Sequence, residues 1–197
     1  MNEFKNDDDW QKEFRDRVLK PFYYEHSFES RFVFADKGKL ADHLQREMAV
    51  DTVLQKPTNA LVSIEEKIVR WKGIIYKAFT LETMSCTVPG REKQGWMYTA
   101  QCDYLFYCFV QEGEKSCIAY LIPFAKLREW FFDHDRYLNF PKTTTEQINQ
   151  TECRVTDIDL VIKAIPSTTR YEIYEPIKSV LLTTEQIRNC KQLLLPV

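Results

Sequence analysis

The chain has 197 residues, of which 44% are hydrophobic and 14% aromatic, and its formal net charge is −2. This suits one globular domain with a sizeable core, and the low content of glycine (five) and proline (eight) excludes a low-complexity or disordered chain. The slightly acidic charge excludes a global positive field for nucleic acid, although local basic patches remain compatible with binding. No apolar run approaches the length of a membrane span and the acidic start is unlike a secretory signal, so we expect a soluble cytoplasmic protein.

Six cysteines are spread widely through the sequence without any Cys-x-x-Cys pair. Their placement in apolar segments predicts free, buried thiols in a reducing compartment. Only three histidines accompany them, which argues against a zinc site.

In the first half of the chain, periodicity predicts helices followed by a set of strands. The expected elements are a helix at 10–19 that Asp9 caps and Pro21 ends, a strand at 28–34, a helix at 39–48, and strands at 50–55, 60–69 and 74–84. Short turns at residues 56–59 and 72–73 join the last three strands. Such turns between apolar strands are typical of an antiparallel meander.

The second half continues this alternation of helices and strands. After a polar loop at 86–94, we expect a short helix at 95–102, a hairpin at 104–111 and 116–123, an aromatic helix at 125–132, strands at 155–163 and 170–175, and a helix at 184–194. The sequence therefore predicts an α/β domain: a mixed sheet with an antiparallel meander at 50–84, and helices packed against it.

Charged residues lie within the apolar strand segments between residues 49 and 85. Asp51 opens the first strand of the expected meander, Glu65, Glu66 and Lys67 lie in the second, and Glu82 closes the third. Charge inside an apolar strand costs several kcal/mol unless it is paired or bound to a metal ion. Folds tolerate this cost mainly where chemistry needs the charge.

Strand geometry predicts that these side chains meet. Residues two apart on a strand project from one face, about 6.6 Å apart, so Glu65 and Lys67 point together and Glu66 points to the opposite side. Because neighbouring strands lie about 4.8 Å apart, Asp51 and Glu82 reach the same place from the flanking strands. Three ionised carboxylates repel one another, and Mg²⁺ or Mn²⁺, which prefer oxygen ligands, would remove the repulsion. Lys67 would then offer positive charge to a phosphate and help to activate water.

The segment 49–67 resembles the PD-(D/E)XK nuclease superfamily, with Asp51 in the first acidic position and Glu65-Glu66-Lys67 in the (D/E)XK position. Over residues 39–111, the expected order of helix, three strands, helix and strand is similar to the core of that family. Val50 stands where proline is common in the superfamily.

The chain also resembles small phage-type members of the superfamily. The matching pairs are Leu81-Glu82, Gly95-Trp96 and Asp103-Tyr104. We therefore expect a single domain at 1–197, with a nuclease-like core at about 39–123, an N-terminal helix and strand, and a C-terminal elaboration.

The resemblance implies a restriction-endonuclease-like mixed sheet, with an antiparallel meander flanked by helices, and a metal-dependent nuclease site. Asp51 and Glu65 would be metal ligands and Lys67 the catalytic lysine, while the geometric argument adds Glu82 as a ligand. Two choices remain open. Glu66 is an alternative ligand to Glu65, and if the third strand of the meander is 74–84, Glu82 takes the main acidic position.

Two further residues are secondary candidates. Glu47 lies near the end of the helix before the first meander strand, where such nucleases often place an accessory acid, although an exposed helical glutamate is the simpler interpretation. Lys93, at the start of the expected second core helix, is the best candidate for a phosphate contact.

Together these observations predict a Mg²⁺- or Mn²⁺-dependent nuclease that acts on DNA, with RNA as an alternative substrate, encoded by a phage or mobile element and located in the bacterial cytoplasm. No membrane partner is expected, and a homodimer is one option for its assembly. The competing hypothesis is a non-catalytic, nuclease-like binding protein, such as a phage accessory factor or an inhibitor of host defence. The acidic net charge and the many aromatic residues support that alternative.

Overall fold

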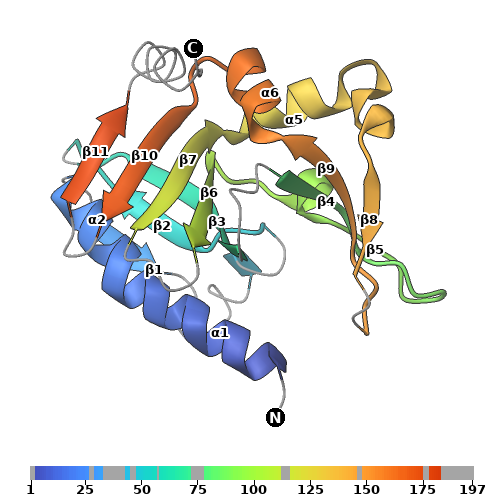
Figure 1. The fold of residues 1–197 in the computed structure, drawn as a ribbon, viewed down its shortest axis with the longest axis horizontal. Helices are drawn as coiled ribbons and strands as arrows, with labels where there is room; N and C mark the ends of the chain where they lie inside the picture. Colours follow the sequence, from blue (N-terminus) through green and yellow to red (C-terminus); the bar gives the residue numbers. More distant parts are fainter. Residues whose placement is uncertain are drawn as a thin grey trace, which may run out of the picture.

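The structure is a computed structural model in which residues 3–26, 29–32, 43–44, 48–56, 58–71, 78–111, 116–145, 148–174 and 178–182 are described. It is a mixed α/β fold with two sheets, in which most strand pairs are antiparallel (Figure 1). No helix among these residues is both long and apolar enough to cross a membrane.

Among the described residues, the larger sheet has seven strands, of which one neighbouring pair is parallel. In spatial order they are β1 (Glu29–Phe32), β2 (Thr52–Gln55), β3 (Leu61–Trp71), β6 (Tyr104–Gln111), β7 (Ser116–Pro123), β10 (Thr169–Tyr174) and β11 (Lys178–Leu182). Strands β3 and β6 are parallel, and every other neighbouring pair is antiparallel. The antiparallel meander of this sheet is thus β1-β2-β3.

The smaller sheet has four antiparallel strands. In spatial order they are β5 (Lys93–Gln94), β4 (Ala78–Cys86), β9 (Glu152–Asp157) and β8 (Lys142–Thr144). The short helix α4 (Trp96–Thr99) follows β5, and α5 (Phe124–Phe132) follows β7. The 3₁₀ segment η3 (Asp133–Asn139) leads to β8, and α6 (Ile158–Ala164) follows β9.

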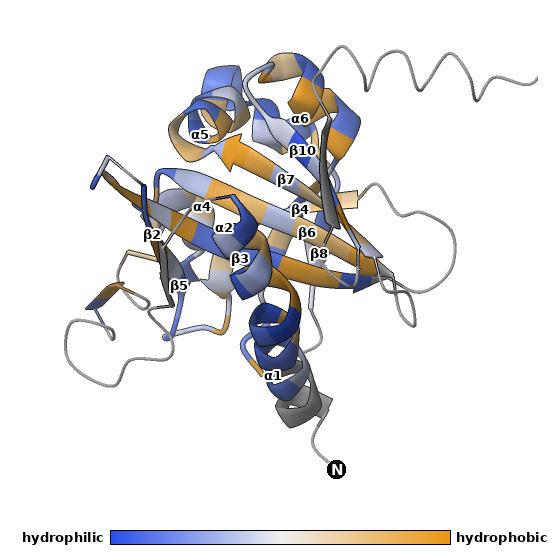
Figure 2. Cartoon of the chain, turned by 90° about the vertical axis from the view of Figure 1, so that its left-hand side faces the viewer, coloured by the Kyte–Doolittle hydropathy of each residue, from blue (hydrophilic) through white to orange (hydrophobic). Residues whose placement is uncertain are grey.

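A continuous helical segment at the N-terminus covers one face of the larger sheet (Figures 1 and 2). It consists of α1 (Glu3–Phe14), a π-helical turn η1 (Arg15–Leu19) and α2 (Lys20–Glu25). Its buried side chains pack against β2, β3, β6 and β7 in one apolar cluster. The coloured part of α1 is mostly hydrophilic, whereas β7 is largely hydrophobic (Figure 2).

A second apolar cluster fills the space on the other face of the larger sheet. It joins β4 of the smaller sheet, through Phe79 and Leu81, to helices α4, α5 and α6 and to strand β6. The two clusters therefore bury both faces of β6, whose residues Leu105 to Val110 are all buried.

The predicted meander at 50–84 is wrong in its third strand. In the part of the chain that the structure describes, β4 does not pair with β3, because β3 uses its second edge for the parallel partner β6. Residues 74–77 of the predicted strand lie outside the described residues. Strand β4 instead pairs with β9 and β5 in the smaller sheet. The third meander strand is therefore β3, and the register that would give Glu82 the main acidic position is not found.

Several helix predictions also need correction. Asp9 lies inside α1 and does not cap it. Pro21 does not end the helix, because it directly follows the π-helical turn Arg15–Leu19, where the regular α-helical hydrogen-bond pattern is already interrupted. Residues 158–163 form helix α6, not a strand, since Asp157 caps it by accepting a hydrogen bond from the Asp159 amide at 2.8 Å. Lys93 lies in strand β5, before the helix begins. The predicted helix at 184–194 and most of the one at 39–48 lie outside the described residues.

The hairpin β6-β7, the aromatic helix α5 and strand β10 form where the sequence predicts them. The described cysteines are free thiols, and all but Cys153 are buried.

Candidate functional site

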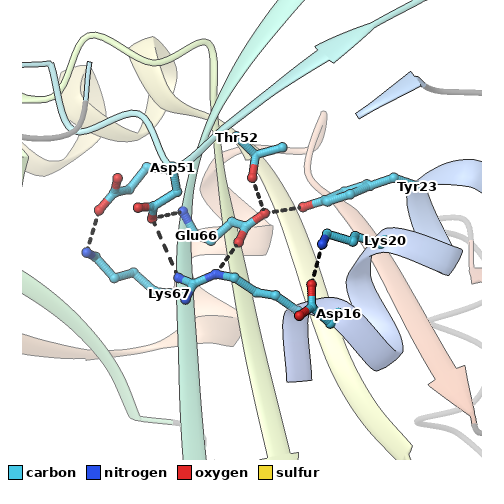
Figure 3. Close-up of polar contacts among 9 residues, drawn as sticks. Asp16, Lys20, Tyr23, Asp51, Thr52, Glu66 and Lys67 are labelled. Atoms are coloured by element: carbon cyan, nitrogen blue, oxygen red, sulfur yellow. Dashed lines mark hydrogen bonds and ion pairs between the residues drawn. The ribbon is translucent and has the colours of Figure 1, made fainter. Parts of the chain in front are cut away.

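Asp51 marks the point at which β2 and β3 separate. The described pairing of β2 with β3 ends at Thr52 and Ile64, and the Asp51 amide donates to the Ile64 carbonyl at 2.9 Å. Two residues further along β3, the Glu66 amide donates a hydrogen bond to the Asp51 carboxylate at 3.0 Å. A side chain thus replaces the next backbone partner, which holds the Asp51 carboxylate beside the middle of β3 (Figure 3).

Glu65 and Lys67 project from the same face of β3, as the period of a strand requires. Their side chains form a direct ion pair. The Glu65 side chain is 5% exposed and that of Lys67 is 32% exposed, so the carboxylate is covered while the lysine reaches solvent. The Lys67 ammonium also lies 5.4 Å from the centre of the Trp96 ring, at the start of α4.

Glu66 points to the opposite face, toward the N-terminal helices. Its carboxylate accepts hydrogen bonds from the Thr52 hydroxyl at 2.7 Å, the Tyr23 hydroxyl at 3.0 Å and the Arg15 Nε at 2.8 Å (Figure 3). The Arg15 Nη2 also lies 4.0 Å from the Asp51 carboxylate. Arg15 therefore connects the N-terminal helix to both acids.

Glu82 reaches the same region from the smaller sheet. It lies on β4 opposite Cys153 of β9, and the Trp96 amide bonds to its carboxylate. Gly95 makes this approach feasible, because a Cβ atom at Gly95 would lie 2.5 Å from the Glu82 carbonyl oxygen. The start of α4 is thus packed directly against Glu82.

Most of the charged side chains described above line one cleft of about 340 Å³ between the two sheets and the N-terminal helix. The residues that line it are Gln11, Arg15, Asp51, Glu66, Lys67, Ile68, Val69, Thr80, Glu82, Trp96, Tyr107 and Cys153. Glu65 lies behind this surface, bonded to Lys67.

The site contains more acidic than basic side chains. Among the described residues of the site, four carboxylates (Asp51, Glu65, Glu66 and Glu82) accompany two cations (Arg15 and Lys67), which gives a charge of −2 if all are ionised. Such an excess is unfavourable in a partly buried cleft, because the charges repel one another at low dielectric.

Burial is the largest cause of the raised pKa values of the acids in this site. Burial raises the pKa of Glu65 to about 8, with Lys67 acting in the opposite direction and Asp51 and Glu66 adding to the rise. Burial also raises the pKa of Glu66, opposed chiefly by Arg15, and that of Glu82, opposed by Lys67 and the Trp96 amide. Burial acts to lower the pKa of Lys67, but Glu65, Asp51 and Glu82 outweigh it, so the pKa of Lys67 is raised and the ammonium stays charged.

The structure brings Asp51, Glu65, Lys67 and Glu82 into one region, as the sequence predicts, and Glu66 points to the opposite face of β3, also as predicted. Their arrangement differs from the prediction in one respect, since Glu82 comes from the second sheet and not from a strand next to β3.

The two secondary candidates do not join this group. Lys93 is exposed on β5 and does not line the cleft. Glu47 lies outside the described residues.

Three site residues were not predicted from the sequence. Thr52 had a readable signal, because it is a polar residue at an inward position of β2, next to Asp51. Arg15 and Tyr23 had none, since they are far from Glu66 in the sequence and meet it only in the fold.

Among the described residues, no three His, Cys, Asp or Glu side chains stand close enough to form a ready metal-binding group. The contacts explain this, because Glu65 is turned to Lys67 and Asp51 to the Glu66 amide. Comparison of the chain with protein-family models, with curated proteins and with solved structures finds no match.

Proposed function

We propose that the chain is a metal-dependent nuclease that hydrolyses phosphodiester bonds of DNA. The observation that carries this proposal is that Asp51, held on the Glu66 amide where β2 and β3 separate, lies close enough to the Glu65–Lys67 ion pair to raise the pKa of both residues. Each residue of the acid, acid-x-lysine pattern then lies in or directly behind one cleft.

The order of the larger sheet supports the same proposal. An antiparallel meander, β1-β2-β3, carries the acidic residues, and β6 lies parallel to β3 after the intervening helix α4. We propose that these elements form a restriction-endonuclease-like core, in which the N-terminal helical segment takes the place of the first helix. The core then begins at α1, not at residue 39.

The donor set suits a hard divalent cation such as Mg²⁺ or Mn²⁺. Carboxylate oxygens are the ligands that these ions prefer, and the excess negative charge of the cleft favours a cation. Asp51 and Glu82, which line the cleft, would hold the ion together with Glu65, whose carboxylate would have to turn from Lys67 to do so. Glu66 is the weaker alternative to Glu65, because its carboxylate already accepts three hydrogen bonds. When bound, the ion would supply positive charge to a phosphate and activate water.

Lys67 is the group best placed to act on a substrate. It lines the cleft, it is more exposed than Glu65, and its raised pKa keeps it protonated. Its ammonium would stabilise the negative charge that develops on a phosphate during hydrolysis. Trp96 covers one side of the ammonium and restricts its position.

A second candidate function is that of a nuclease-like binding protein without activity. One observation favours it: Arg15 already compensates Asp51 and Glu66, so these acids form a satisfied structural network as well as a site. Such a protein would bind DNA or a protein partner without added metal, and Lys67→Ala would leave that binding unchanged.

The proposal is tested by incubating the purified protein with single- and double-stranded DNA and RNA, with and without Mn²⁺ or Mg²⁺. A calorimetric Mn²⁺ titration accompanies the assay. We expect metal-dependent cleavage of DNA and saturable binding of Mn²⁺. Intact substrates under every condition, together with no heat of Mn²⁺ binding, would overturn the proposal.

A further inference from the structure

The N-terminal helical segment contains a π-helical turn, which is wider than an α-helical turn and begins at Arg15. The five residues Arg15–Leu19 form a π-helix between α1 and α2. A single π-helical turn inside an α-helix is rare and occurs frequently at functional sites, because it redirects the side chains around it. Gln11, four residues before Arg15, lines the cleft as well, so this face of the helix forms one wall of the site.

The Arg15 guanidinium contacts two acids of the cleft through different nitrogen atoms. Nε bonds to Glu66 at 2.8 Å, and Nη2 lies 4.0 Å from the same Asp51 oxygen that accepts the Glu66 amide. The Arg15 side chain is only 12% exposed, while that of Glu66 is fully covered. The positive charge of Arg15 is therefore fixed next to a proposed metal ligand, with little solvent to screen it.

We infer that Arg15 is a positioning residue of the proposed metal site, whose guanidinium holds Asp51 and neutralises it when no divalent cation is bound. This inference rests on the proposed function. Without Arg15, Lys67 would be the one cation left to balance the four carboxylates among the described residues of the site. The metal-free fold would then be less stable, and the site would attract a cation more strongly. With Arg15 present, the guanidinium repels the incoming divalent cation, so the site binds that cation more weakly.

The test compares Mn²⁺ affinity and melting temperature in the full-length parent and in Arg15→Gln, which removes the charge but retains a hydrogen-bond donor. Arg17→Gln is the matched control, because Arg17 lies two residues further on the same helix, is 55% exposed and pairs with Glu13. We expect Arg15→Gln to have a lower melting temperature than the parent without metal and to bind Mn²⁺ about tenfold more tightly. Saturating Mn²⁺ should also raise the melting temperature of Arg15→Gln by more than it raises that of the parent. Arg17→Gln should match the parent in all three.

The outcomes separate this inference from the proposed function. If the parent binds Mn²⁺ and Arg15→Gln binds it equally or more weakly, the inference is overturned while the metal site stands. If only Arg15→Gln binds, Arg15 blocks the site, which supports the inference and contradicts a metal-dependent activity of the parent. If neither binds, both proposals are overturned.

A second measurement needs no variant and decides the matter if Arg15→Gln does not fold. In the parent, the Nε–H signal of Arg15 in nuclear magnetic resonance should shift in a saturable way as Mg²⁺ is added. The corresponding signal of Arg17 should remain in place. An Arg15 signal that does not move at saturating Mg²⁺ would overturn the inference.

Discussion

Replacing Glu65 with glutamine should remove a large part of the pH dependence of stability. The pKa of Glu65 is raised from 4.5 to about 8 in the folded protein, mainly by burial. Between these two values the folded state binds a proton that the unfolded state releases, so stability falls as the pH rises. One such proton corresponds to a slope of about 1.4 kcal/mol per pH unit. Glutamine cannot titrate, so Glu65→Gln should lack this slope.

The assay is urea denaturation of parent and variant at several pH values between 5 and 8, with chelator present. The parent should lose about 1 kcal/mol or more per pH unit relative to Glu65→Gln. Glu129→Gln, which alters an exposed carboxylate on α5, is the control, and its free energy of unfolding should depend on pH as that of the parent does. Saturating Mn²⁺ should flatten the profile of the parent, because a bound cation favours the ionised carboxylate. Parallel profiles for parent and Glu65→Gln would refute the argument that burial holds a proton on Glu65.

Two further substitutions test the packing around the site. Thr52→Val removes the 2.7 Å hydrogen bond to the buried Glu66 carboxylate while conserving the shape of the side chain. The free energy of unfolding, measured in urea, should therefore fall by about 1–3 kcal/mol. An unchanged free energy of unfolding would show that Glu66 does not depend on this donor. Gly95→Ala places a Cβ atom 2.5 Å from the Glu82 carbonyl oxygen, and the displacement this forces should cost about 1–3 kcal/mol and lower the melting temperature by several degrees. A melting temperature equal to that of the parent would mean that α4 and β4 are not in close contact.

The parts of the site that were predictable depend on short-range geometry. Glu65 and Lys67 were expected on one face because a strand has a period of two residues, and their ion pair confirms that placement. Asp51 was expected nearby because a short turn joins its strand to β3, and a short turn leaves few ways to pair two strands.

The parts that were not predictable depend on contacts between distant segments. Strand β4 pairs with β9, for example Glu82 with Cys153, and no local pattern distinguishes that partner from β3. The same limit applies to Arg15, whose bond to Glu66 joins a helix to a strand 51 residues away. The predicted strand at 155–163 is wrong beyond Asp157, because a short apolar run suits either a strand or a helix and Asp157 caps helix α6.

The most direct test of the account is a comparison of Lys67→Ala with Asp51→Asn in Mn²⁺ binding and in DNA cleavage. Lysine is not a metal ligand, so Lys67→Ala should abolish cleavage and keep Mn²⁺ binding largely intact. Asp51→Asn removes a ligand and should weaken both. If the parent neither binds Mn²⁺ nor cleaves, or if Lys67→Ala cleaves as well as the parent, these residues are not the active site of a metal-dependent nuclease.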